Sequence, residues 1–275
     1  MQNRKLQEFL ISSTTLLRDT IKNKKAIIPL NGGVFAFVLA KITKLAIGHN
    51  LTCFYIDNGM MRHNEAANKI NFFREKLDLE VWHIDAKELF LNNLKDVYDY
   101  DKKQEVINET FLEVAKQTII DINQKIDFAL MGTSFDDVNQ GLNIAKALDK
   151  NVVIFEPLKQ LSLQQVIDIG NLLSIEPEFL NEKIFPLSGF GLMVEDEVRE
   201  EKILVLKKAY YLICKILGEK AEDTFEIKIR DDISIKDRFN LYIETKELLS
   251  EVNIKKIKDQ ITGLLPNVNK IFIKI

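Results

Sequence analysis

The sequence predicts an α/β protein in which a parallel, doubly wound sheet is followed by a small α+β domain. Short apolar runs alternate with stretches of helical spacing through the first part of the 275 residues. Several of these runs end in glycine, asparagine or aspartate. The last part of the chain instead contains apolar and polar residues in strict alternation, a strand pattern. Apolar strands alternating with helices are typical of parallel sheets covered on both faces.

The predicted elements follow this pattern in order. Strands are expected at 26–30, 51–56, 80–84, 128–131 and 151–155, with helices at 4–22, 34–47, 64–77, 86–94, 104–122 and 162–173. Later elements are a loop at 184–192, a helix at 197–217, strands at 224–230 and 239–243, a helix at 254–264 and a strand at 270–275. The character changes near 183–196, so we expect domains at 1–190 and 191–275.

Composition excludes several classes of protein. Hydrophobic residues make up 46% and charged residues 29%, and the net charge is −3, as in a soluble globular protein. The sequence has no long basic block, so nucleic acid is not an expected partner. It also has no apolar run of 18 residues, so no membrane span is expected. The N-terminus does not resemble a secretory signal. Cys53 and Cys214 are expected to be reduced in the cytoplasm, and neither cysteines nor histidines cluster as in a metal site.

A glycine turn between the first strand and the next helix is the centre of the predicted site. The apolar strand 26–30 leads into Asn31-Gly32-Gly33, and a helix is expected from Val34. This layout aims backbone N–H groups and the positive end of a helix at an anion, usually a phosphate. The turn contains no Lys, Ser or Thr, and Phe35 stands where a polar residue would be expected. Only the backbone part of a phosphate loop is therefore present.

Other candidate residues follow the remaining strands, because ligands of doubly wound sheets bind at the carboxyl ends of strands. The candidates for nucleotide binding are Asn31, Gly32, Gly33, Val34, Asp57, Gly132 and Thr133. The glycines can equally form a scaffold turn, and Asp57 can be a solvated turn residue. No catalytic residue and no metal ligand is assigned.

Several motifs agree with one family in order and spacing. They are Leu-Asn-Gly-Gly-Val-Phe-Ala at 30–36, the segments 54–62 and 155–158, Met-Gly-Thr at 131–133 followed by Asp-Asp-Val at 136–138, and the segment 185–192. Together they resemble the ATP pyrophosphatase part of GMP synthetase with its C-terminal dimerisation domain, over nearly the whole chain. The match at 136–138 adds Asp137 to the candidate residues, although a turn cap is the alternative there.

The resemblance implies a fold, a chemistry and partners. The fold is that of the adenine nucleotide alpha-hydrolases. Members of the family adenylylate XMP with ATP and magnesium, release pyrophosphate, and let ammonia displace AMP. The ammonia normally comes from a glutaminase, and because one predicted helix leads directly into the first strand, we expect no glutaminase domain in this chain. The second domain implies a homodimer, with strand 270–275 and the preceding helix as the pairing elements.

Departures from the family pattern affect the expected chemistry. Asn31, Phe35 and Ala36 replace a Ser, an Asp and a Ser that engage pyrophosphate and support the metal in the family. Losing a metal-supporting carboxylate costs on the order of several kcal/mol of charge stabilisation. Glu195 and Asp196 follow the Gly-Leu motif where the family has a phosphate-binding Arg, so we expect them to repel a substrate phosphate. The segment 139–151 is shorter than the family's insert at this place, which closes over XMP as a lid. We also expect no counterpart of the family's XMP-binding C-terminal tail.

Three functions are compatible with this pattern. The leading hypothesis is a degenerate GMP synthetase paralogue that has lost XMP amination and keeps a binding or regulatory site for an unidentified nucleotide. The second is an active, ammonia-dependent ATP pyrophosphatase that uses ATP and magnesium on XMP or another carbonyl substrate. The third is a structural dimer that binds a protein partner, with Phe35 filling the phosphate site.

Overall fold

The protein divides into two compact units. The computed structural model describes residues 2–122, 125–132, 148–182, 185–218, 221 and 224–274. The first unit comprises Met1–Asp57, Ala66–Ala86 and Asn108–Phe185, and the second comprises Asn58–Glu65, Lys87–Ile107 and Pro186–Ile275. The last passage between units is at Phe185–Pro186, near the expected change of character. The second unit also contains two early segments that the sequence assigned to the first domain.

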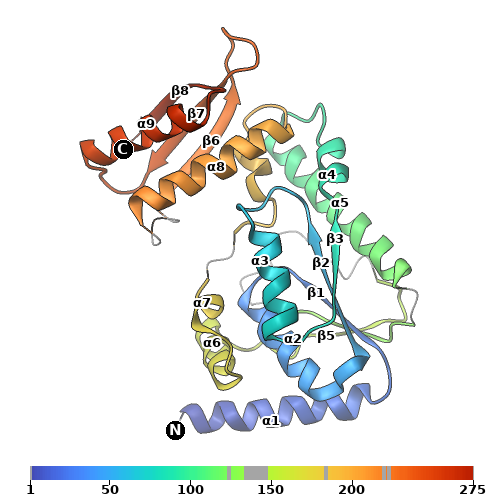
Figure 1. Cartoon of the computed structure of the whole chain (residues 1–275). Helices are drawn as coiled ribbons and strands as arrows, with labels where there is room; N and C mark the ends of the chain where they lie inside the picture. Colours follow the sequence, from blue (N-terminus) through green and yellow to red (C-terminus); the bar gives the residue numbers. More distant parts are fainter. Residues whose placement is uncertain are drawn as a thin grey trace. The chain divides into compact units, whose positions relative to one another are not determined.

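The first unit is built on a five-stranded parallel sheet in the order β3-β2-β1-β4-β5 (Figure 1). Its strands are β1 (Ala26–Leu30), β2 (Leu51–Asp57), β3 (Val81–Asp85), β4 (Phe128–Leu130) and β5 (Val153–Phe155). All five predicted strands are present, and every neighbouring pair is parallel. The predicted α/β class is therefore confirmed.

Helices follow the strands as predicted, with two differences: one expected helix is divided, and the short helix Pro177–Leu180 is not among the expected elements. The α-helices described up to residue 180 are α1 (Gln2–Ile21), α2 (Val34–Ile47), α3 (Glu65–Asn71), α4 (Lys87–Asn93), α5 (Tyr100–Asp121), α6 (Leu163–Leu172) and α7 (Pro177–Leu180). Short 3₁₀ turns lie at Gly48–Asn50 and Gly189–Met193. The single helix expected at 64–77 is divided, because Phe72–Lys76 forms a π-helical turn after α3. In this wider turn, adjacent Phe72 and Phe73 are both buried, and both rings contact Phe37.

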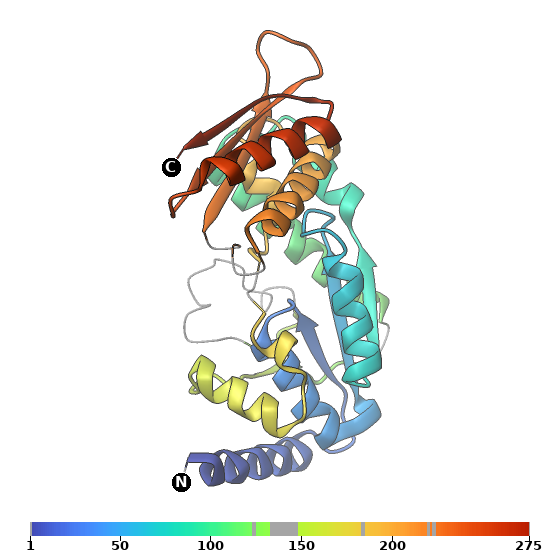
Figure 2. The ribbon, with the colours of Figure 1, turned by 60° about the vertical axis from the view of Figure 1, so that its left-hand side comes forward.

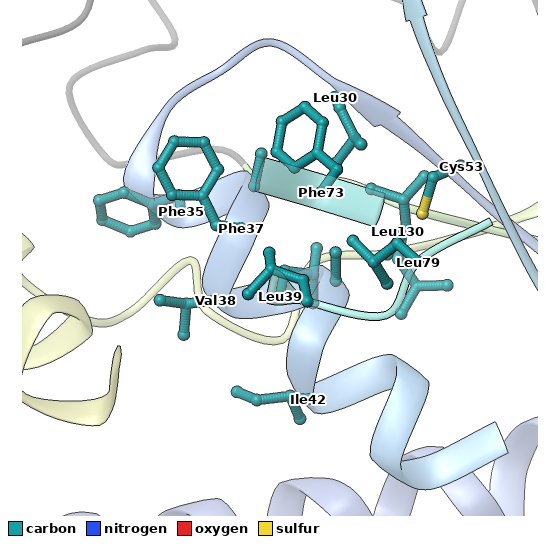
Figure 3. Packing of buried hydrophobic residues seen from close by; sticks show 14 of the residues in the cluster. Leu30, Phe35, Phe37, Val38, Leu39, Ile42, Cys53, Phe73, Leu79 and Leu130 are labelled. Carbon is teal, nitrogen blue, oxygen red and sulfur yellow. The ribbon is translucent and has the colours of Figure 1, made fainter. Parts of the chain in front are cut away.

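Helix α2 is the centre of the core cluster that covers one face of the sheet (Figure 3). Ten of its fourteen residues are buried, as expected for a helix that is apolar on nearly every side. Helices α1, α2 and α6 pack against one another. Residues Ala26, Ile28 and Leu30 of β1 join this cluster, while Ile27, which points to the opposite face, is only 1% exposed. The sheet is thus covered on both faces.

The second unit contains a three-stranded sheet in the order β6-β7-β8. Its elements are α8 (Glu200–Leu217), β6 (Phe225–Asp231), β7 (Phe239–Thr245), α9 (Glu251–Leu264) and β8 (Val268–Lys274). Strand β7 pairs antiparallel with β6 and parallel with β8. Helices α8 and α9 lie side by side on one face of this sheet (Figure 2). The predicted order of helices and strands is confirmed.

Among the residues that the structure describes, no helix has both the length and the apolar character needed to cross a membrane.

Candidate functional site

The candidate site of the first unit lies where the strand order reverses. The chain runs outward from β1 through β2 to β3, and then returns to the other side of β1 for β4. In doubly wound sheets ligands bind at such a reversal, beside the carboxyl ends of the two flanking strands. The register pairs Ala26 with Phe128 and Ile27 with Ala129, so β1 and β4 end at the same edge. The glycine turn and Gly132 therefore meet at the reversal, as the sequence predicts.

The glycine turn combines a left-handed residue with an extended residue at the start of α2. Gly32 has a φ of +80°, in the left-handed region that favours glycine. Gly33 is extended and acts as the N-cap of α2. The N–H of Gly33 donates to Oδ1 of Asn31 at 3.0 Å. Asn31 is exposed and holds the turn through its side chain, as asparagine commonly does.

The first turn of α2 presents backbone donors at this edge. The carbonyl of Gly33 accepts from the N–H groups of Ala36 and Phe37, at 3.0 and 3.2 Å. The N–H groups of Val34 and Phe35 precede these positions and have no carbonyl partner within the helix, as in any α-helix. They also lie at the positive end of the helix dipole. An anion can be held here by backbone groups alone.

Gly132 lies directly against the first turn of α2. A Cβ atom at this position would be 2.8 Å from both Cα and N of Ala36 and 2.9 Å from the carbonyl carbon of Phe35. Only glycine allows two backbones to approach this closely. Gly132 therefore fixes the distance between the end of β4 and the glycine turn.

Phe35 and Ala36 belong to the core. Their side chains are 5% and 2% exposed, and Phe35 is part of the buried cluster at the start of α2 (Figure 3). In this chain both side chains pack in the core. The resemblance described above implies polar, pyrophosphate-engaging side chains at these two positions. A buried phenylalanine contributes about 1.5–3 kcal/mol to folding, so Phe35 helps to stabilise the core.

Asp57 ends β2, on the strand next to β1. The register pairs Leu30 with Tyr55, so Asp57 lies two residues further along, at the edge of the glycine turn. Its Oδ2 is 3.6 Å from Nε2 of His83 on β3, and its carbonyl accepts from the N–H of Ala86 at 2.9 Å. The remaining two candidates, Thr133 and Asp137, lie outside the described residues.

The sequence interpretation missed a lysine at the turn. Lys69 of α3 has a side chain that is only 4% exposed, and its Nζ donates to the carbonyl of Gly32 at 3.2 Å. The ammonium is also ion-paired with Oε2 of Glu182 and lies 5.0 Å from the centre of the Phe37 ring. A signal for it exists, because Lys69 lies next to the apolar residues Ala66 and Ile70 of α3 and Phe73 of the π-helical turn after it.

Asp196, one of the two acids that follow the Gly-Leu motif, pairs with a buried lysine. Nζ of Lys202, a fully buried residue, pairs with Oδ1 of Asp196 and, at 3.1 Å, with Oδ2 of Asp231. Burial raises the pKa of Asp196, but the N–H of Asp231 and the ammonium of Lys202 together hold it below its usual value. Asp196 is therefore the internal partner of a buried lysine in the second unit, and the expected repulsion of a substrate phosphate by Glu195 and Asp196 stays a prediction.

The described residues contain no group of three His, Cys, Asp or Glu side chains placed to hold a metal ion.

Comparisons with known proteins agree with the motifs. No protein-family model matches the sequence. The GMP synthase [glutamine-hydrolyzing] of Thermotoga petrophila is 31% identical over 230 residues, which are 78% of this chain and 46% of that protein. The enzyme of the same name from Petrotoga mobilis is 32% identical over 228 residues, which are 78% of this chain and 45% of that protein. The chain thus spans somewhat less than half the length of these relatives.

Solved structures support the fold. An NH3-dependent NAD synthetase from Campylobacter jejuni, in complex with nitrate, matches 94% of both chains with a TM-score of 0.52 and 12% identity. An NMN synthetase from Francisella tularensis matches 95% of both chains with a TM-score of 0.51 and 13% identity. The predicted fold, that of the ATP pyrophosphatases and adenine nucleotide alpha-hydrolases, is confirmed.

Proposed function

Because the chain is homologous to GMP synthases over 78% of its length and has the ATP pyrophosphatase fold, we propose that it binds an adenine nucleotide at the glycine turn and has lost the ability to aminate XMP. One observation carries the proposal. The turn keeps Gly32 at a φ of +80° and Gly33 as N-cap, while Phe35 and Ala36 are buried in the core. Backbone donors for a phosphate remain, and the polar side chains do not.

Binding and catalysis make different demands on such a site. Backbone N–H groups and a helix N-terminus suffice to bind a phosphate. Adenylyl transfer also needs charges that stabilise the transition state more than the bound substrate. Losing about 4 kcal/mol of that stabilisation slows the reaction roughly a thousandfold. The protein is then a nucleotide-responsive binding protein whose nucleotide acts as a regulatory ligand.

The cofactor in this proposal is ATP with magnesium, as the relationship to ATP-using enzymes suggests. Magnesium usually binds through substrate phosphates and few protein carboxylates. Phosphate binding by the N–H groups of Val34 and Phe35 therefore requires no metal cage built by the protein.

Two variants of Gly33 test the binding site, and they differ only in charge. The extended backbone of Gly33 suits Asn and Asp, which are both favoured N-cap residues. We expect wild type and Gly33→Asn to bind ATP with similar affinity by calorimetry, and Gly33→Asp to bind at least tenfold more weakly because its carboxylate repels a phosphate. Equal affinity of the two variants would place the nucleotide elsewhere. No binding of ATP, XMP or GMP at millimolar concentration would refute the proposal and favour the structural dimer.

A second measurement tests the loss of catalysis. We expect no pyrophosphate release above background when wild type is mixed with ATP, magnesium, ammonia and XMP. Release that depends on both XMP and ammonia would establish the active enzyme in place of the binding protein.

We further propose that the second unit forms a homodimer through the face of its sheet that points away from α8 and α9. On this face Tyr242 and Phe272 stack with ring centres 4.9 Å apart, Arg230 lies 4.7 Å from the Tyr242 ring, and Phe272 is 45% exposed. We expect a dimer in sedimentation equilibrium, a monomer for Phe272→Glu, and a dimer for the control Leu248→Glu, whose side chain is 90% exposed on a loop. A monomeric wild type would contradict the proposal.

A further inference from the structure

The glycine turn receives its positive charge from another element. Residues 30–36 contain no lysine or arginine, yet Nζ of Lys69 on α3 donates to the carbonyl of Gly32. The stem of the side chain also follows the turn, since Cε lies 3.4 Å from where a Cβ of Gly32 would be. Lysine is a common phosphate ligand in nucleotide-binding loops, where it acts as a point charge.

We propose that Lys69 is the cation of the nucleotide site, and that Glu182 is an internal carboxylate which a ligand phosphate must displace from it. This inference rests on the proposed function and deepens it. A buried ammonium requires an anionic partner, because an unpaired charge in a protein interior is strongly destabilising. Glu182 supplies that partner in the chain on its own.

The burial of the two partners decides which one leaves. The side chain of Lys69 is 4% exposed, and that of Glu182 is 29% exposed. Glu182 follows α7 by two residues, while Lys69 is fixed within α3 and against the Phe37 ring. The carboxylate therefore returns to water at a lower desolvation cost than the ammonium. Lys69 has three donors, so it can keep Gly32 while exchanging a carboxylate for a phosphate.

This exchange sets the affinity and the class of ligand. The observed affinity is lower than the intrinsic one, because each binding event must separate Glu182 from Lys69. A di- or triphosphate carries more negative charge than a carboxylate and competes well for the ammonium. A nucleoside monophosphate has less advantage. The site is thus expected to select nucleoside di- and triphosphates.

Two variants remove the two partners, and the structure provides a matched pair of controls. Glu182→Gln removes the competing charge but leaves an amide oxygen that can accept from Lys69, and Lys69→Met removes the cation but keeps an apolar stem. The controls are Glu176→Gln and Lys76→Met. They break a more exposed ion pair of 3.1 Å between the π-helical turn after α3 and the N-cap of α7.

The measurement is calorimetric titration of ATP and inorganic pyrophosphate at low salt. We expect Glu182→Gln to bind both about tenfold more tightly than wild type, Lys69→Met at least tenfold more weakly, and both controls like wild type. A gain of affinity in Glu182→Gln cannot come from misfolding. If wild type binds ATP but neither Glu182→Gln nor Lys69→Met changes the affinity, this inference is wrong and the proposed function stands. Weaker binding by Glu182→Gln would also overturn it. If no variant binds, the proposed function fails together with the inference.

Discussion

Gly132→Ala tests whether the end of β4 must touch the first turn of α2. The added methyl would lie 2.8 Å from two backbone atoms of Ala36 and 2.9 Å from a third atom, in Phe35. Ordinary van der Waals contact begins near 3.4 Å, so the deficit is about 0.6 Å at each of the closest atoms. Backbone atoms cannot rotate away as the end of a side chain can. The helix and the strand must therefore separate.

The expected cost follows from this overlap. Overpacking of a well-packed interior costs about 1–3 kcal/mol, and more where the backbone must move. For a chain of this size that corresponds to a decrease of roughly 2–12 °C in the midpoint of thermal unfolding of the first unit. Separation of β4 from α2 also displaces the glycine turn, so nucleotide affinity should fall as well.

The only tryptophan of the chain reports on this unit. Trp82 lies on β3 and is 37% exposed, so its fluorescence changes when the first unit unfolds. We expect Gly132→Ala to lower the midpoint of urea unfolding followed by Trp82 fluorescence. The control is Gly263→Ala in α9, where an added Cβ would meet nothing within 4 Å and the midpoint should not fall. An unchanged midpoint for Gly132→Ala would refute the close approach of the two backbones.

Three further predictions concern buried groups. Lys202→Met leaves the carboxylate of Asp196 without its cation, whereas Asp231 keeps its ion pair with Arg199, and should lower the free energy of unfolding by ~2–3 kcal/mol in urea titrations followed by circular dichroism. Lys274→Met, which breaks an exposed ion pair with Glu244, should lower the free energy of unfolding much less than Lys202→Met does, and equal losses would contradict the argument. The folded state lowers the pKa of Asp196, so this carboxylate contributes fully to stability above about pH 3.9, and its contribution is lost as the pH falls through the folded-state pKa. Asp196→Asn should therefore weaken the pH dependence of stability below about pH 4. Burial raises the pKa of the Cys53 thiol, so a thiol reagent should modify Cys214 in the native protein and reach Cys53 only after unfolding. Modification of Cys53 before unfolding would contradict the burial of its strand.

Much of the fold could be predicted because the local patterns and the tertiary structure agree. The apolar run 26–30 and the turn Asn31-Gly32-Gly33 specify β1 and the start of α2 without knowledge of the rest of the chain. The local pattern of strand 239–243 is less regular, because Asn240 lies among its apolar residues. It is nevertheless the central strand of its sheet, where pairing on both sides outweighs local preference.

The candidate site could be predicted only in part, because its charges come from distant segments. Backbone geometry at Gly32 and Gly33 is local, so sequence spacing revealed it. The contact between Lys69 and Glu182 joins residues 113 positions apart, and no local pattern specifies it. Likewise, the acid Asp196 can be interpreted only once its partner Lys202 is known to be buried.

The composition of the second unit has a consequence for the synthesis of the chain. Lys103 is 1% exposed, and its Nζ donates at 2.6 Å to the carbonyl of Val194, which is translated 91 residues later. The segments Asn58–Glu65 and Lys87–Ile107 must therefore leave the ribosome long before the rest of their unit exists. At about 5–20 residues per second, the delay between Lys103 and its acceptor lasts roughly 5–20 seconds. During that interval the nascent chain contains a lysine whose acceptor in the folded unit has not yet been translated.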